Sequence, residues 1–394
     1  MYQGKRVIGI VAEFNPFHEG HAYLLREARE RFGAAYVVIV MSGDFVQRGE
    51  PAILSKYDRT RAAISAGADL VLQLPVMFST AAAEDFAAAA VAVLERTGIC
   101  DCLLFGSESA DPSLLQKTAD FLAAEQQCQP AVSENEQIYE QILQFRQLLR
   151  QRQAEGLSFP KARSMALSEV LALPADFLPN DVLGIEYLKA IRLQKAAMTT
   201  CILQRDASLK SAHSIRKEML AAREQSGEPH EWYRKLDDFS DMLSYQLLRL
   251  QREGIPFSDF QDVSAELSQS IARQCREKHS FTERIGLLKT KNLTHARISR
   301  GLLHILLEIR REDYEKTKKR GFLPCLRVLG VSRAGRELLT KLPEPLMISP
   351  ARTLKQQPVL TEDPSLRADF FASALWQQLS DQPHNDFTEK LIVL

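Results

Sequence analysis

The first thirty residues constrain the fold more than any other stretch of the chain. Val7–Ala12 is a short apolar run with β-branched residues, and it predicts a buried strand. From Gly20 onward, apolar residues recur at the three- and four-residue spacing of an amphipathic helix. The dipeptide Asn15-Pro16 is a turn signal between these two elements. The chain therefore opens with a strand, a tight loop and the N-terminus of a helix.

Two histidines lie at the start of this helix. His18 and His21 are three residues apart with Gly20 between them, so both imidazoles can point toward the mouth of the loop. Unpaired backbone N–H groups and the helix dipole make an anion site there. Histidine supplies donors that can carry charge near neutral pH, and glycine lets the backbone approach phosphates closely. This pattern suits nucleotidyl transfer, which needs prepositioned donors around an α-phosphate.

Two other interpretations of the histidines remain open. They could be ordinary histidines on a helix surface, or they could bind a metal ion. Two histidines at i and i+3, without a third His, Cys or carboxylate at ligand spacing, are weak support for a metal site. We therefore expect a nucleotide site without a dedicated metal centre.

The stretch that follows predicts a Rossmann-like parallel sheet with helices on both faces. Strands are expected at Tyr36–Met41, Asp69–Leu74 and Cys102–Phe105, with helices at Lys56–Gly67 and at about Ala81–Arg96 between them. In such sheets, ligands bind beyond the carboxyl ends of the strands. The segments expected at that edge are Glu13–His21, Ser42–Asp44 and Gly106–Glu108.

A polar helical insertion, residues 112–175, is expected to interrupt the sheet. After it, either Asn180 or Asp181 can cap a new helix, and Thr199–Gln204 resumes the parallel sheet and ends at Arg205. Ser211–Lys217 then resembles a helix start. Ser211 or Ser214 can cap it, and Arg216 and Lys217 add positive charge near N–H groups that attract phosphate. A capped, basic surface helix is the plainer alternative.

The second half of the chain reads as mainly helical. Helices are expected at Met242–Arg252, Ser258–Arg276 and Thr294–Arg310, and a small appended α/β element is expected over Pro324–Pro364. We therefore expect a nucleotide-binding domain over residues 1–228 and a mainly helical C-terminal domain over residues 229–394.

Charge is unevenly placed along the chain. The whole chain has 50 Lys and Arg residues and 50 Asp and Glu residues, but Arg273–Arg336 contains 17 of the former and only 6 of the latter. A basic helical face can neutralise the phosphates of an RNA, although most charge runs are simply solvated. The residues expected to bind RNA are Arg297, Arg300, Lys316, Lys318, Lys319 and Arg320.

Composition excludes several other classes of protein. The chain has 394 residues, of which 45% are hydrophobic and 25% charged, as in globular proteins of two or three domains. No segment is apolar over the length of a bilayer span, and Met1–Arg6 precedes a strand rather than a signal sequence, so a cytoplasmic protein with no membrane partner is expected. The six cysteines lack the paired spacing of a zinc ribbon or a disulfide framework.

The motifs resemble those of a known family. His18-Glu-Gly-His21 is similar to the HxGH signature of nucleotidylyltransferases related to class I aminoacyl-tRNA synthetases, and Ser211–Lys217 resembles their second signature, ISSTxIR. The string Val11-Ala-Glu-Phe-Asn-Pro-Phe-His-Glu-Gly-His21 resembles the opening of the bacterial tRNA(Met) cytidine acetate ligases. Further resemblances run in order along the chain, at Met41–Ala52, Lys56–Arg61, Gly67–Pro75, Leu104–Glu108, Pro179–Leu188 and Ala296–Arg300.

The resemblance implies an enzyme that uses ATP to adenylate acetate. It would pass the acetyl group to N4 of the anticodon wobble cytidine of elongator tRNA(Met), with His18 and His21 stabilising the transition state. Mg²⁺ is expected with the ATP, and Asp44 is a candidate contact. The residues implied in ATP binding are Val11, Ala12, Glu13, Phe14, Asn15, Pro16, Phe17, His18, Glu19, Gly20, His21, Gly106, Asn180, Arg205, Ser211, Arg216 and Lys217.

One departure from the family pattern keeps other functions open. Family members have a longer segment containing Tyr-His-Asp before the second signature, where this chain has only Asp206–Lys210. If the longer segment places RNA or the acyl group, substrate handling or activity differs here. The alternatives are an enzyme that adenylates a small metabolite and a noncatalytic RNA-binding protein that senses ATP. The sequence leaves the oligomeric state open.

Overall fold

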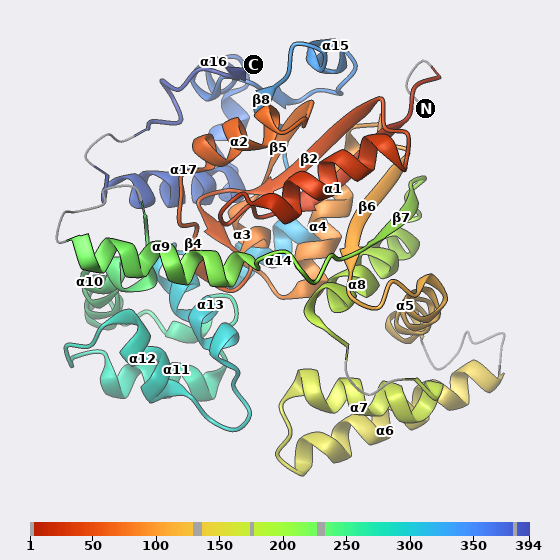
Figure 1. The fold of residues 1–394 in the computed structure, drawn as a ribbon. Coiled ribbons are helices and arrows are strands. Elements are labelled where there is room, and N and C mark those ends of the chain that lie inside the picture. Colours follow the sequence, from red (N-terminus) through yellow and green to blue (C-terminus); the bar gives the residue numbers. More distant parts are fainter. Residues whose placement is uncertain (1–3, 129–135, 174–176, 227–232, 381–383) are drawn as a thin grey trace.

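A single mixed sheet forms the centre of the molecule (Figure 1). The computed structural model describes residues 4–128, 136–173, 177–226, 233–380 and 384–394. The strand order is β10-β8-β5-β2-β1-β6-β7, and β9 pairs with β8. The strands are β1 (Val7–Ala12), β2 (Tyr36–Ser42), β5 (Leu70–Leu74), β6 (Cys102–Ser107), β7 (Thr199–Gln204), β8 (Leu326–Val331), β9 (Leu346–Met347) and β10 (Ile392–Val393).

The five strands from the first part of the chain are parallel, as the sequence predicts. The central ones are covered on both faces, which explains why β2 is a continuous apolar run rather than an alternating one. Val38 and Val40 pack into the core on one face, and Val37 and Ile39 pack into the core on the other. The predicted Rossmann-like sheet is confirmed.

Helices cover the two faces of the sheet in separate layers. Helices α1 (Glu19–Glu30) and α2 (Lys56–Ser65) pack on one face, where Leu25 and Ile64 meet the strands. The helices on the other face are α3 (Val76–Ser79), α4 (Ala83–Arg96), α5 (Pro112–Gln127) and α8 (Pro179–Gln194). Because the chain runs from β1 outward to β5 and then returns to β6 on the other side of β1, its topology reverses between β1 and β6. Ligands bind at such switch points.

The predicted insertion is helical. Helices α6 (Glu136–Ala154) and α7 (Phe159–Leu171) pack together and extend from the body below α5 and α8 in Figure 1. Arg146 Nε lies 2.8 Å from Glu125 Oε1, which ties α6 to the end of α5. Helix α5 ends at Gln127, and part of the stretch that follows it lies outside the described residues.

Helices also dominate the following segment. They are α9 (Ala212–Ser226), α10 (Ser240–Arg252), α11 (Ala265–Gln274), α12 (Phe281–Leu288), α13 (His295–Leu306) and α14 (Arg311–Lys319). The helix predicted over Ser258–Arg276 is shorter than expected. A single turn occupies Phe257–Asp259, and α11 starts only after Ser264, whose hydroxyl accepts a hydrogen bond from Leu267 N at 3.2 Å. Among the described residues, no helix is long and apolar enough to cross a bilayer.

The C-terminal segment corrects one prediction. Pro324–Pro364 was expected to form a small appended element, but β8 joins the main sheet antiparallel to β5, and β10 lies beside it. A buried ion pair helps fix this arrangement, because Lys56 Nζ lies 2.8 Å from Asp386 Oδ1 and Arg327 Nη2 lies 2.8 Å from the same oxygen. The boundary between two domains at residues 228 and 229 stays a prediction. Strands β8, β9 and β10, which follow that boundary, join the main sheet. The remaining helices are α15 (Arg336–Leu339), α16 (Pro350–Gln356) and α17 (Pro364–Gln377).

A glycine in α8 sets the distance between that helix and β6. A Cβ atom at Gly184 would lie 2.5 Å from Phe105 Cε2, closer than packed carbons can approach. We expect Gly184→Ala to lower the free energy of unfolding by about 1–3 kcal/mol through overpacking. The matched control is Gly286→Ala in α12, where nothing lies within 4 Å of the new methyl group and alanine gains about 0.5–1 kcal/mol from helix propensity. Urea unfolding followed by circular dichroism tests both, and equal midpoints would contradict this packing.

Candidate functional site

The loop after β1 delivers both histidines to the start of α1. His18 is the N-cap of the helix, and its Nδ1 accepts a hydrogen bond from Gly20 N at 3.0 Å. The backbone N–H of His18 in turn donates to His21 Nδ1 at 3.3 Å. The sequence did not foresee this reciprocal cap. Because each ring uses Nδ1 as an acceptor, we assign the proton of each neutral imidazole to Nε2.

Burial keeps both imidazoles neutral. Burial lowers the pKa of His21 to about 3, and the neighbouring charges of His18 and Arg205 add to the effect. Burial is also the main cause that lowers the pKa of His18, followed by the charges of Arg205 and Arg216. The charged form of these donors, which the sequence allows near neutral pH, is therefore disfavoured. At pH 7 the site offers two neutral Nε2–H groups.

Packing explains the other residues of the opening motif. A Cβ atom at Gly20 would lie 2.9 Å from His18 Cε1, so the capping imidazole needs glycine at that position. Phe14 and Phe17 both pack on His21, with ring centroids 4.8 and 5.7 Å away. The other predicted residues of this motif lie at the end of β1 (Val11 and Ala12), in the loop (Asn15 and Pro16) and in the first turn of α1 (Glu19).

Arg216 connects the second predicted motif to the first. Its Nη1 donates to Asn15 O at 2.6 Å, and Asn15 Oδ1 accepts from Ile53 N at 2.7 Å. Ser211 occupies the predicted capping position of α9, because its hydroxyl accepts from Ser214 N at 3.2 Å. The structure thus brings Arg216 to the loop that carries the histidines, while Lys217 is exposed on the same helix.

Glu13 places a carboxyl group beside the same loop. Its Oε1 accepts from Gln47 N at 2.9 Å, in the hairpin formed by β3 (Phe45–Val46) and β4 (Glu50–Pro51). Burial raises the pKa of Glu13, and the hydrogen bond from Gln47 and the charge of Arg216 offset this only in part. Glu13 therefore fixes the hairpin against the end of β1.

The ends of β6 and β7 form the other side of the site. Gly106 packs against Arg205, whose Cγ would lie 3.3 Å from a Cβ at that glycine. Neither Asn180 nor Asp181 caps α8, contrary to the prediction, since the helix begins at Pro179 with Leu178 at its N-cap. The side chain of Glu108 accepts hydrogen bonds from that helix start instead. This capping role of Glu108 is not visible in the sequence, because its partners lie about 70 residues away.

Asp44 does not fit the predicted Mg²⁺ contact. It is 3% exposed, its Oδ1 accepts from Lys56 N at 3.0 Å, and its Oδ2 lies 3.5 Å from Lys56 Nζ. A buried cation already balances this carboxylate. Across the described ranges, no group of three or more His, Cys, Asp or Glu residues could hold a metal ion.

The structure separates the six residues predicted to bind RNA into two groups. Arg300 is 9% exposed and its Nε lies 2.6 Å from Asp262 Oδ2, so the prediction for Arg300 is wrong. Its backbone packs against Gly49, which ties α13 to β4 rather than to a ligand. Lys318 and Arg320 also pair with acidic residues. Of the other three, Lys316 and Lys319 are exposed and Arg297 is half-buried.

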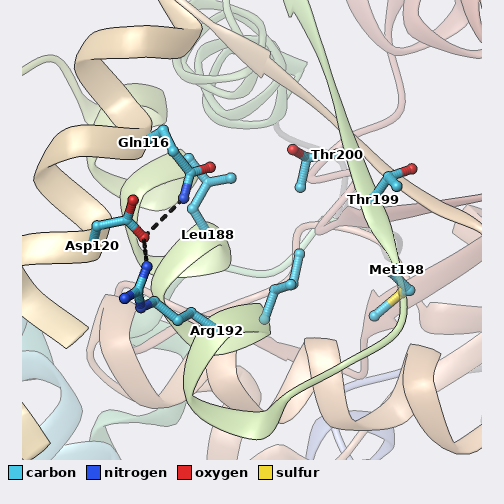
Figure 2. A pocket seen from close by; sticks show the side chains of 8 residues that line it. Gln116, Asp120, Leu188, Arg192, Met198, Thr199 and Thr200 are labelled. Carbon is cyan, nitrogen blue, oxygen red and sulfur yellow. Dashed lines mark hydrogen bonds and ion pairs between the residues drawn. The ribbon is translucent and has the colours of Figure 1, made fainter. Parts of the chain in front are cut away.

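A separate hollow lies away from the histidines. It has a volume of about 410 Å³ and is lined by α5, α8 and the start of β7. Figure 2 shows the Asp120 carboxylate in contact with both Gln116 and Arg192, at 3.0 and 2.5 Å. Met198 and Thr199 mark the amino end of β7, whereas the histidine loop lies at the carboxyl ends of the parallel strands. None of the residues predicted for the nucleotide site lines this hollow.

Comparison with known proteins agrees with this geometry. A family model described as HIGH Nucleotidyl Transferase matches residues 5–390. The tRNA(Met) cytidine acetate ligase of Thermoanaerobacter sp. strain X514 is 33% identical over 369 residues, which cover 85% of this chain and 86% of that protein. The chain belongs to the tRNA(Met) cytidine acetate ligase family. Another member, from Acetivibrio thermocellus, is 31% identical and is matched over 99% of this chain and 100% of its own length.

The family extends to solved structures. The crystal structure of Thermotoga maritima TmcAL bound with alpha-thio ATP superposes with a TM-score of 0.81 and 29% sequence identity, and the match covers 99% of each chain. The apo form of the same protein gives a TM-score of 0.80. The fold of this family member is therefore shared along its whole length.

The neutral state of His21 makes a testable contribution to stability. In the unfolded chain the His21 ring takes up a proton at about pH 6.5, whereas in the folded protein the lowered pKa delays this to about pH 3. This contribution is present above pH 6.5 and is lost progressively as the pH falls toward 3. It amounts to about 2 kcal/mol between pH 7 and pH 5.

Urea unfolding at pH 7 and pH 5 measures that contribution. We expect His21→Gln to lose about 2 kcal/mol less than the wild type between the two values. His295→Gln, which removes an exposed histidine of α13, serves as the control and keeps the wild-type dependence. An unchanged dependence in His21→Gln would show that this ring titrates normally in the folded state.

Proposed function

We propose that this chain is an ATP-dependent ligase that acetylates the anticodon wobble cytidine of elongator tRNA(Met) at N4. Acetate would attack the α-phosphate of ATP to give acetyl-adenylate and pyrophosphate. The cytidine amine would then attack the acetyl carbonyl, releasing AMP and a proton. The observation that carries the proposal is the reciprocally capped pair His18 and His21 at the switch point of a fold shared with an ATP-analogue complex.

The histidines can serve the first step as fixed donors. Their Nδ1 atoms are occupied by backbone N–H groups, so only Nε2–H is free to donate to a phosphoryl oxygen. A neutral Nε2–H group donates its hydrogen bond without changing its protonation state during the attack on the α-phosphate. Because the group is already fixed in position, no solvent has to reorganise around the developing charge. Arg216, held by Asn15 O, supplies permanent positive charge close by.

Asn180, Arg205 and the backbone around Gly106 would complete the ATP-binding site on the side opposite the histidine loop. Ser211 and Lys217 would add a hydroxyl group and a positive charge at the start of α9. The described residues offer no built site for Mg²⁺, which would have to arrive with the triphosphate.

Three cations of α13 and α14 suit the tRNA backbone. The exposed Lys316 and Lys319 and the half-buried Arg297 would contribute salt-dependent affinity without reading sequence. A tRNA substrate is consistent with the cytoplasmic location expected from the sequence.

The direct test is transfer of labelled acetate to unmodified elongator tRNA(Met) in the presence of ATP, followed by nucleoside analysis. We expect label in N4-acetylcytidine, and a rate about 10²–10³-fold lower for His21→Ala, typical of the loss of one preorganised donor. The control substrate is the same tRNA with uridine in place of the wobble cytidine, which should accept no label.

Two outcomes would contradict this proposal. Label recovered as an adenylate of a small metabolite, with none in tRNA, would favour the adenylating alternative. Tight ATP binding with no pyrophosphate release would favour an ATP-sensing protein and would direct attention to the short segment Asp206–Lys210.

A further inference from the structure

Glu108 lies between the two groups proposed to complete the ATP site. Its Oε1 accepts from Asn180 Nδ2 at 2.5 Å and lies 3.2 Å from Arg205 Nη1. Its Oε2 accepts from the backbone N–H groups of Asn180 and Asp181 at 3.1 and 3.0 Å. The carboxylate thus acts as the N-terminal cap of α8 from a distant part of the chain.

A second carboxylate makes the reverse connection. Asp181 is 3% exposed, and its Oδ1 accepts from Ser107 Oγ at 2.5 Å and from Glu108 N at 3.1 Å. Its Oδ2 accepts from Ser109 N at 3.2 Å. The loop after β6 and the start of α8 therefore hold each other through two carboxylates, but only that of Glu108 touches the side chains of Asn180 and Arg205.

The Glu108 carboxylate would lie close to the triphosphate of bound ATP, and like charges repel. Its presence there therefore requires a compensating role. Two unit charges about 6 Å apart repel by about 3 kcal/mol at an effective dielectric constant of about 20. If Glu108 had no other role, its removal would strengthen ATP binding. Its contacts point the other way, since they fix the rotamers of two long or flexible polar side chains at once.

We propose that Glu108 is a positioning residue that orients Asn180 and Arg205 for ATP. The inference rests on the proposed function, in which these two side chains contact the nucleotide. Among the described residues, each retains hydrogen-bonding groups without a partner for that purpose. Arg205 has further guanidinium N–H groups beyond Nη1, and Asn180 has its Oδ1 and a second amide hydrogen.

The test compares the affinities of purified variants for α,β-methylene ATP by isothermal titration calorimetry. Glu108→Gln keeps the size of the side chain but turns one acceptor into a donor that faces other donors. We expect its binding to weaken about tenfold, as when a hydrogen bond to a charged group is lost. In the Asn180→Ala/Arg205→Ala background, the same substitution should no longer weaken binding and should strengthen it, because the positioned side chains are gone and only the repulsion between Glu108 and the triphosphate remains.

Asp181→Asn is the matched control for a merely structural effect. It loosens the same loop but leaves the side chains of Asn180 and Arg205 on Glu108. We expect Asp181→Asn to lower the thermal midpoint at least as much as Glu108→Gln while costing less ATP-analogue affinity. Equal losses of affinity in the two variants would reduce Glu108 to a structural cap and overturn the inference.

The remaining outcomes separate this inference from the proposed function. If Asn180→Ala and Arg205→Ala bind the analogue as the wild type does, the proposed ATP contacts are wrong and the role of Glu108 falls with them. If both weaken binding but Glu108→Gln binds as tightly as the wild type, or more tightly, only the positioning role is refuted.

Discussion

One buried guanidinium group holds together the edge of the sheet on which the site is built. Arg59 is 0% exposed and donates to Glu13 O at 2.6 Å, to Ser42 O at 3.0 Å, to Gly43 O and to Leu54 O at 3.1 Å. These carbonyls follow the carboxyl ends of β1 and β2 or precede α2, where the chain leaves regular hydrogen bonding. Burial lowers the pKa of Arg59 to about 10, so it remains charged at neutral pH. Lysine has no fork of donors that could reach four acceptors at once.

The loop that carries the histidines starts from this edge of the sheet. The loop from Glu13 is fixed at its start by Arg59 and at Asn15 by Ile53 and Arg216. Its last residue then caps α1. The histidines are therefore oriented by main-chain hydrogen bonds rather than by a carboxylate partner, and their burial keeps them neutral. In the proposed function, such a site would stabilise developing phosphoryl charge by preorganised dipoles, with a fixed cation, Arg216, close by.

The sequence predicted those parts of the site that depend on local pattern. The strand, loop and helix of the opening motif follow from apolar spacing, the Asn15-Pro16 turn and a helix start, and the parallel sheet follows from alternating elements. The family resemblance placed Asn180, Arg205 and Arg216 near the nucleotide, and the structure brings Arg216 to the histidine loop. Local pattern also located the basic helices, although it could not distinguish the buried Arg300 from its exposed neighbours.

What the sequence missed depends on contacts between distant segments. Arg59 looks like one more cation on a surface helix, because nothing near it in the chain shows that backbone carbonyls of other segments surround its guanidinium group. The capping of α8 by Glu108, in place of the expected Asn180 or Asp181, was missed for the same reason, because Glu108 lies far from the helix in the sequence. The antiparallel pairing of β8 with β5 joins residues more than 250 positions apart and is not visible in periodicity.

The central claim is that His18 and His21 present neutral Nε2–H groups while their Nδ1 atoms accept backbone hydrogen bonds. Long-range ¹H–¹⁵N correlation spectra of protein labelled with ¹⁵N-histidine report the protonation of each ring nitrogen directly. We expect, at pH 7, a protonated Nε2 and an unprotonated Nδ1 for both rings, with no titration of His21 until well below pH 5. A protonated Nδ1 in either ring, or titration of His21 near pH 6.5, would contradict this claim.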